Sequence, residues 1–148
     1  MVTDTKQDVK LIFTTVFTQV MAAWQDGKRR FFTDGGTTSS KTYSIMQFLK
    51  HLLENYPEPI LATVTSESMP HLKRGAIRDF IAIMGDDLIP SCWNKTDMVY
   101  TWPQNGCRLE YVSDDHPEKF LGGRRHIWFL NEMNNIHKMS YMEGDLRT

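Results

Sequence analysis

The sequence predicts an α/β fold in which helices flank a parallel core sheet, with a β-hairpin added to it. Three observations support this prediction. Stripes of apolar residues at helical spacing alternate with short apolar runs typical of buried strands. A loop rich in glycine, serine and threonine lies between a predicted strand and a predicted helix, and Asn105-Gly106 is a strong hairpin signal. The 148 residues, 41% of them hydrophobic, suit a single domain.

Composition excludes several classes of protein. Lys and Arg number 17 against 18 Asp and Glu, so the net charge of -1 excludes a polycation that coats nucleic acid. Two cysteines, Cys92 and Cys107, form neither a disulfide framework nor a zinc pattern. No apolar run approaches the ~20 residues that a bilayer crossing needs, and the polar residues 1–8 do not form a secretory signal. We therefore expect a soluble protein with no membrane partner.

Three helices are predicted from apolar residues recurring at three- and four-residue steps. The first extends from about Asp4 to Asp26. The second follows the glycine-rich loop and ends before Pro57. The third begins at Ser68 as N-cap, has Pro70 in its first turn and continues to Met84.

The predicted strands are short apolar or alternating runs bounded by turn residues. They comprise residues 31–34, 60–65, the hairpin pair 98–102 and 107–112, and 126–130. Residues 114–119 suggest a turn with a short helix, and residues 133–148 are polar and weakly patterned. Because about thirty residues separate the first two strands, they and the helix between them form one βαβ unit.

The loop between the first strand and the second helix has the residue types of a phosphate-binding P-loop. Phosphate oxygens need several backbone N–H donors at a helix N-terminus, and small residues let that backbone wrap closely. The candidate nucleotide-binding residues are Gly35, Gly36, Thr37, Thr38, Ser39, Ser40, Lys41 and Thr42. Lys41, which is also a candidate catalytic residue, would stabilise charge on the β- and γ-phosphates, and the Thr42 hydroxyl would bind Mg²⁺. Ser40 stands where the motif has its second glycine, and the alternative interpretation is a helix-capping turn that happens to precede a lysine.

A P-loop enzyme also needs an acidic strand that serves the metal and the attacking water. Residues 127–130 are apolar and are followed by Asn131 and Glu132, which places two polar side chains at the carboxyl end of a strand. Glu132 is the candidate catalytic carboxylate that activates water. Asn131 stands in the usual place of an aspartate and is a candidate metal ligand, together with Thr42. A strand that merely ends in a polar turn is the alternative.

Together these motifs resemble the large terminase subunit of tailed bacteriophages. The resemblance rests on Gly35 to Ser44, a phosphate loop with Ser-Ser-Lys-Thr, and on Phe129 to Asn134, similar to the Asn-Glu-Ala-Asn ending of the family's acidic strand. Val64 to Gly75 resembles the family's strand followed by a basic helix, and Gly122 to Arg125 resembles its glycine-arginine approach to the acidic strand. Order and spacing agree from about Arg30 to Ile136.

The resemblance implies the additional-strand, RecA-like class of P-loop NTPases and an ATPase that packages DNA. ATP and Mg²⁺ would be the cofactors. Double-stranded phage DNA, a small terminase subunit and the portal protein would be the partners. The complete protein would form a homo-oligomeric ring in the cytoplasm of an infected bacterial host.

Two departures from the family matter. Thr37 and Thr38 stand where many large terminases have an arginine that stabilises the transferring phosphoryl group, which leaves Arg74, Arg78, Arg124 and Arg125 as candidates for that role. Only 16 residues follow Glu132, so we also expect that the coupling strand and the nuclease domain are missing and that the fold is incomplete at its C-terminal end.

The expected organisation is a single partial ATPase domain. It consists of an N-terminal helix (1–27), the region from phosphate loop to acidic strand (28–136) and a tail (137–148). Two alternative functions remain open at this point. One is a non-catalytic remnant or partner-dependent binding module, and the other is a P-loop NTPase with another role, such as a small kinase or a helicase-like protein.

Overall fold

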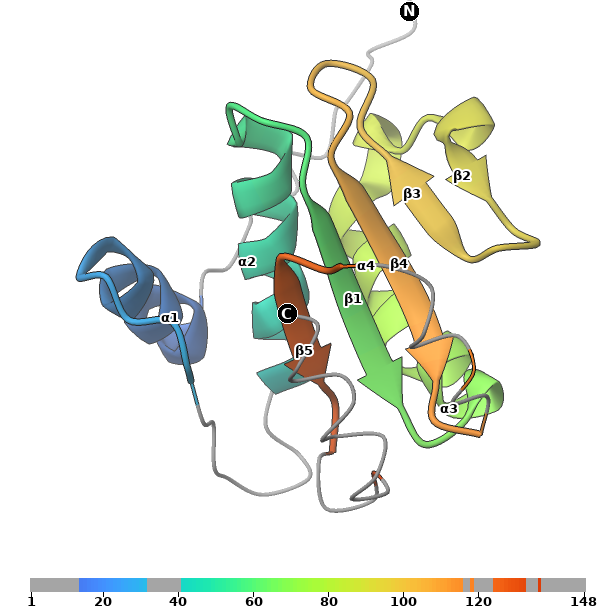
Figure 1. The fold of residues 1–148 in the computed structure, drawn as a ribbon, viewed down its shortest axis with the longest axis horizontal. Coiled ribbons are helices and arrows are strands. Elements are labelled where there is room, and N and C mark those ends of the chain that lie inside the picture. Colours follow the sequence, from blue (N-terminus) through green and yellow to red (C-terminus); the bar gives the residue numbers. More distant parts are fainter. Residues whose placement is uncertain (1–13, 32–40, 116–117, 119–123, 133–135, 137–148) are drawn as a thin grey trace, which may run out of the picture.

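The computed structural model of the chain describes residues 14–31, 41–115, 118, 124–132 and 136. Within them the predicted α/β architecture is confirmed: helices pack on a five-stranded sheet with the strand order β2-β3-β4-β1-β5 (Figure 1). Several predictions lie outside the described residues. These are the start of the first helix, the strand over 32–34, the loop residues 35–40, the pair Gly122-Gly123 and nearly all of the tail.

The sheet has a parallel centre and an antiparallel side. The central strand β1 (Leu61–Ser66) pairs in parallel with β4 (Arg108–Ser113) and with β5 (Ile127–Leu130). The predicted hairpin is confirmed, since β3 (Val99–Thr101) pairs antiparallel with β4. A further strand that the sequence did not predict, β2 (Trp93–Asn94), pairs antiparallel with β3 and is too short to carry a periodic signal.

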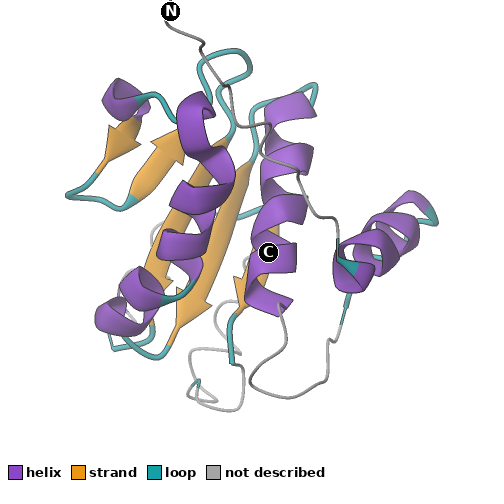
Figure 2. Cartoon of the chain, turned by 180° about the vertical axis from the view of Figure 1, so that it is seen from behind, coloured by secondary structure: helices purple, strands orange, loops and turns teal. Residues whose placement is uncertain are grey.

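The described residues form four α-helices. They are α1 (Thr15–Gln25), α2 (Lys41–Asn55), α3 (Met69–Arg74) and α4 (Ala76–Met84). Two short 3₁₀ turns follow α4, η1 (Gly85–Asp87) and η2 (Pro90–Cys92). In Figure 1, α2 and α4 lie behind the sheet, and Figure 2 shows both of them in front of the strands from the opposite side. The two helices therefore cover the same face.

The prediction of one helix from residue 68 to residue 84 was wrong, because that segment is divided into α3 and α4. Gly75 separates them with a non-helical backbone (φ -114°, ψ -99°) and ends α3 by donating its N–H to the carbonyl of His71 (3.0 Å). The predicted cap is present, since the Ser68 hydroxyl accepts a bond from the N–H of His71 (3.4 Å). The apolar spacing continues across Gly75, so periodicity alone could not reveal the break.

The hydrophobic core fills the space between the sheet and α2 and α4. Alternate residues of the strands point into it, as period-two strands require, and it includes an aromatic group on α4 and the β2–β4 side. Its buried members include Ile45, Phe48, Leu49, Ala62, Val64, Ile77, Phe80, Tyr100, Leu109 and Tyr111. The opposite face of β1 is polar: Arg125 is only 2% exposed, and its Nε donates to Thr63 Oγ1 (3.3 Å) while its guanidinium lies over the ring of Trp128.

Candidate functional site

Polar groups from distant parts of the chain meet at one edge of the sheet. Because β1, β4 and β5 are parallel, their carboxyl ends lie along the same edge, which is where open α/β sheets bind ligands. In Figure 1 the arrowheads of these three strands and the first turn of α2 lie at the lower end of the molecule. The amino end of a helix carries unpaired N–H groups and a partial positive charge, so this edge favours an anionic ligand.

The two residues predicted as metal ligands are in direct contact at this edge. Thr42, in the first turn of α2, donates its hydroxyl proton to Asn131 Oδ1 over 3.0 Å, although 89 residues separate them. Asn131 follows β5 and is 6% exposed, and its backbone N–H donates to the carbonyl of Thr65 in β1 (2.8 Å). One polar cluster thus joins α2, β1 and β5. Lys41, the first residue of α2, lies next to it and is half-buried.

Glu132, the candidate catalytic carboxylate, follows directly and has an unusual backbone. Its φ is +55°, a left-handed conformation that side chains with a Cβ seldom adopt. Strained residues of this kind persist only when the surrounding structure holds them, and they are enriched at functional sites. Glu132 Oε2 is 3.4 Å from His71 Nε2, and its side chain is 48% exposed, so the carboxylate is held on one side and open to solvent on the other.

His71 connects Glu132 to a second carboxylate. Its Nδ1 lies 2.9 Å from Oε1 of Glu67, which is located between β1 and α3, four residues before His71. His71 thus lies between two carboxylates, one contacting each ring nitrogen. The sequence analysis quoted this segment for its resemblance and gave neither residue a role. The Glu-x-x-x-His spacing at a predicted helix start was the available signal for their contact.

The fold corresponds to that of solved phage proteins. The structure of the large terminase from a thermophilic bacteriophage, crystal form 2, superposes with a TM-score of 0.79 over 92% of this chain, at 12% sequence identity. The large terminase of the same phage in complex with ADP, crystal form 3, superposes with a TM-score of 0.72 over 92% of this chain, at 13% identity. The chain has the large-terminase fold.

The terminase fold confirms the fold class that the sequence predicted. No family model matches the sequence, and no curated protein matches it, so the relationship is one of structure. The chain spans 36% of the length of each of the two terminase structures. The phosphate-loop residues 35–40 lie outside the described part of the chain, so their role stays a prediction.

Within this terminase fold, the oxygens at the sheet edge suit a magnesium ion that arrives with a nucleotide. Mg²⁺ takes six oxygen ligands at about 2.0–2.1 Å, which places neighbouring ligand oxygens about 2.9 Å apart. The 3.0 Å separation of Thr42 Oγ1 and Asn131 Oδ1 matches that spacing. Both donors are uncharged, and the described residues contain no cluster of three or more His, Cys, Asp or Glu suited to a metal. A metal held by these two oxygens would need further oxygen ligands, of the kind that a phosphate supplies.

The four arginines considered for charge stabilisation differ in availability. Arg125 is 2% exposed and contacts Thr63 and the ring of Trp128, so it is the least accessible of the four. Arg124 is exposed just before β5, at the end of the strand opposite Glu132. Arg78 pairs with Asp79 over 3.1 Å on the surface of α4, and Arg74 is exposed at the end of α3.

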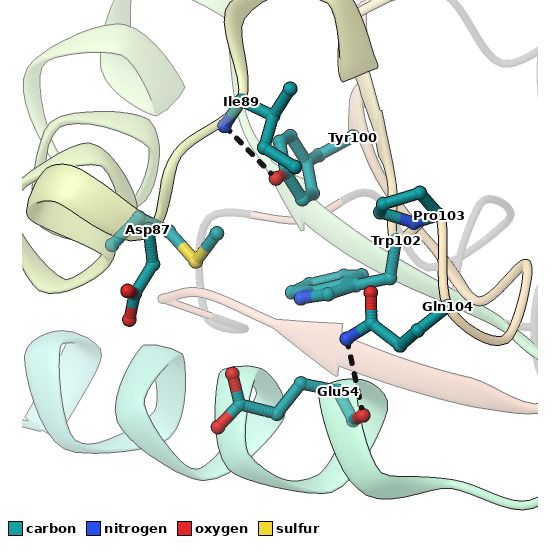
Figure 3. A pocket seen from close by; sticks show the side chains of 8 residues that line it. Glu54, Asp87, Ile89, Tyr100, Trp102, Pro103 and Gln104 are labelled. Atoms are coloured by element: carbon teal, nitrogen blue, oxygen red, sulfur yellow. Dashed lines mark hydrogen bonds between the residues drawn. The ribbon is translucent and has the colours of Figure 1, made fainter.

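A separate pocket of about 300 Å³ lies at the other end of the terminase fold (Figure 3). It is formed by Glu54 near the end of α2, by Asp87 after α4, and by Tyr100 and Trp102 of the hairpin side. Glu54 lies twelve positions after Thr42 on α2, a distance of roughly 18 Å along the helix. The pocket is therefore distinct from the edge where Thr42, Asn131 and Glu132 meet.

No helix in the described part of the chain is both long enough and apolar enough to span a membrane.

Proposed function

We propose that this chain is the nucleotide-binding part of an ATPase of the phage large-terminase type. The observation that carries the proposal is the contact of Thr42 with Asn131, because it joins the start of α2 to the end of β5 as a shared magnesium–phosphate site requires. The fold common to this chain and to a large terminase crystallised with ADP supports it. The loop 35–42 would hold ATP, with Lys41 at the β- and γ-phosphates, and Thr42 and Asn131 would face the Mg²⁺.

The proposed reaction is attack of water on the γ-phosphorus in line with the departing ADP oxygen. Glu132 orients this water and accepts its proton as the new P–O bond forms and the bond to ADP breaks. Mg²⁺, when bound, neutralises charge on the phosphate oxygens. Glu132 is suited to its task because it lies one residue beyond Asn131 and its carboxylate is partly open to solvent.

The biological setting is proposed by analogy with the whole large terminase, of which this chain matches about a third. Double-stranded phage DNA, a small terminase subunit and the portal protein are the proposed partners, in a homo-oligomeric ring inside an infected bacterium. The described residues identify no DNA-contacting surface, so these partners depend on the analogy alone.

A nucleotide titration of the purified chain, with and without Mg²⁺, tests the proposal. We expect wild-type protein to bind ATP with Mg²⁺, and Lys41→Ala to lose binding because the phosphate charge is no longer compensated. His51→Ala is the matched control, since His51 is exposed on the same helix, away from the site. Equal ATP affinity for Lys41→Ala and wild type contradicts the proposal and favours a non-catalytic binding module.

The role of Glu132 is tested by a second variant, in the same titration and in an assay of phosphate release. Glu132→Gln keeps the size of the side chain and removes its basicity, so ATP should bind normally while hydrolysis by the complete protein falls. Turnover equal to that of wild type would assign the base to another residue.

A further inference from the structure

The Glu67–His71–Glu132 cluster lies directly beside the proposed nucleotide site, and the proposed function leaves two of its members without a task. His71 is on α3, which follows the central strand, and Glu132 follows the edge strand β5. The two elements come together because β1 and β5 are parallel neighbours, so whatever follows each strand emerges at the same edge. The contact is therefore built into the sheet.

The cluster constrains a carboxylate whose direction matters for water activation. A glutamate side chain that is 48% exposed ordinarily samples several rotamers. Here two features restrict the conformation of the Glu132 side chain. Its backbone is left-handed, and its carboxylate lies next to His71 Nε2. A general base acts only within hydrogen-bond reach of the proton it removes, so restricting its direction has a direct effect on rate.

The imidazole of His71 is itself fixed. Its Nδ1 lies 2.9 Å from Glu67, and its own backbone N–H is held by the Ser68 hydroxyl at the start of α3. A carboxylate that holds one nitrogen of a histidine sets the orientation in which the other nitrogen is presented. The order of dependence is therefore from Glu67 to His71 to Glu132.

We propose that His71 is a positioning residue that holds the Glu132 carboxylate in its water-activating direction, and that Glu67 fixes the His71 ring for this purpose. The inference rests on the proposed function and extends it to two residues outside the phosphate loop and the acidic strand. His71 acts through Glu132 and does not itself contact the nucleotide.

Two conservative substitutions separate the two contacts of His71. The amide nitrogen of glutamine occupies nearly the place of Nε2, whereas that of asparagine occupies nearly the place of Nδ1. His71→Gln therefore keeps an N–H group near Glu132, and His71→Asn keeps one near Glu67 alone. If the contact with Glu132 is what matters, glutamine rescues and asparagine does not. A merely structural role for His71 would not distinguish the two variants in this direction.

The first measurement needs no nucleotide. In protein with ¹³C-labelled glutamate carboxyl groups, the Glu132 resonance is the one lost in Glu132→Gln. We expect this resonance to shift in His71→Ala and His71→Asn and to stay near its wild-type position in His71→Gln. His51→Ala, an exposed histidine on α2, should leave it unchanged. An unshifted Glu132 resonance in His71→Ala overturns the proposal.

The second measurement compares Mg-ADP with Mg-ADP plus aluminium fluoride, a mimic of the transferring phosphoryl group with its attacking oxygen. His71→Ala should bind Mg-ADP as wild type does and bind the aluminium fluoride complex about 10-fold more weakly, the size usual for loss of an orienting partner. His71→Gln should recover this affinity. Equal affinities of wild type and His71→Ala for both ligands overturn the positioning role, while the proposed function stands.

The two measurements distinguish failure of the proposed function from failure of the positioning role. If wild-type protein binds neither nucleotide complex, the proposed function is wrong, and the carboxyl resonance still decides whether His71 holds Glu132. Far-ultraviolet circular dichroism of each variant confirms that the overall secondary structure is retained before either result is used.

Discussion

Tyr111 on β4 shows how the core treats an ionisable side chain. It is 1% exposed, its ring lies among those of Phe80 and Trp93, and its hydroxyl donates to the sulfur of Met46 (3.8 Å). Burial, with a smaller contribution from the negative charge of Asp79, raises the pKa of Tyr111 well above the ordinary value near 10. The folded chain therefore keeps this phenol protonated at pH values where an unfolded chain ionises it.

The direction of the resulting pH dependence follows from proton counting. Above pH 10 the unfolded chain binds fewer protons at Tyr111 than the folded chain, so the free energy of unfolding decreases as pH rises. We predict that Tyr111→Phe loses less stability than wild type between pH 9 and 11, measured as the urea midpoint at each pH. The two proteins should differ little at pH 7. Parallel pH curves would contradict the role of Tyr111.

At the scale of residues, the sequence indicated Asn131 and Glu132 as candidate site residues because these two polar residues follow an apolar strand. It could not predict that His71 contacts Glu132. That contact depends on β1 and β5 being neighbours in the sheet, which no local pattern encodes. For the same reason the sequence could not predict the burial of Arg125, which contacts Thr63 on another strand.

At the scale of elements, one side chain of the hairpin turn connects the end of α2 to the sheet through hydrogen bonds. Asn105 donates from Nδ2 to the carbonyls of Leu53 (2.7 Å) and Tyr56 (3.0 Å), and its Oδ1 accepts from the N–H of Cys107 (3.0 Å). The last carbonyls of a helix have no partner within it, so this amide caps the end of α2. Gly106 completes the turn with φ +75°.

We predict that Asn105→Ala lowers the free energy of unfolding by about 1–3 kcal/mol, because the part-buried carbonyls of Leu53 in α2 and of Tyr56 just after it lose their donor. Urea denaturation measures this change. Gln104→Ala is the matched control, since the neighbouring Gln104 is exposed and makes a single long contact with the carbonyl of Glu54 (3.3 Å). Asn105→Asp keeps the acceptor for Cys107 and removes both donors. Stability of Asn105→Asp equal to that of wild type would show that the donors do not matter.

The elements also show where periodicity succeeds and where it stops. Alternation and the Asn-Gly signal predicted the hairpin because both are local properties. The break at Gly75 was missed because the apolar spacing continues across it. In the folded chain an added Cβ there would lie 3.2 Å from the carbonyl oxygen of His71. The two-residue strand β2 is defined by its pairing with β3, which periodicity does not show.

At the scale of the whole molecule, the site depends on contacts between segments remote in sequence. The resemblance implied an additional-strand fold. In the described residues β5 pairs with β1, and the predicted strand before the phosphate loop continues outside them, so its place in the sheet stays a prediction. The sequence motifs predicted the order of helices and strands, because the spacing of the motifs along the chain limits that order. The Thr42–Asn131 contact forms only in the assembled sheet.

This arrangement predicts that nucleotide stabilises the entire fold. A ligand held between the start of α2 and the end of β5 binds only the folded chain, so at 100 times its dissociation constant it adds about 2.7 kcal/mol to stability. For a chain of this length that corresponds to roughly 5–10 °C in the unfolding midpoint. We expect this increase for wild type and for His51→Ala with Mg-ADP, and none for Lys41→Ala, measured by thermal denaturation. An equal increase in Lys41→Ala would place the nucleotide elsewhere on the molecule and would contradict a site at the first turn of α2.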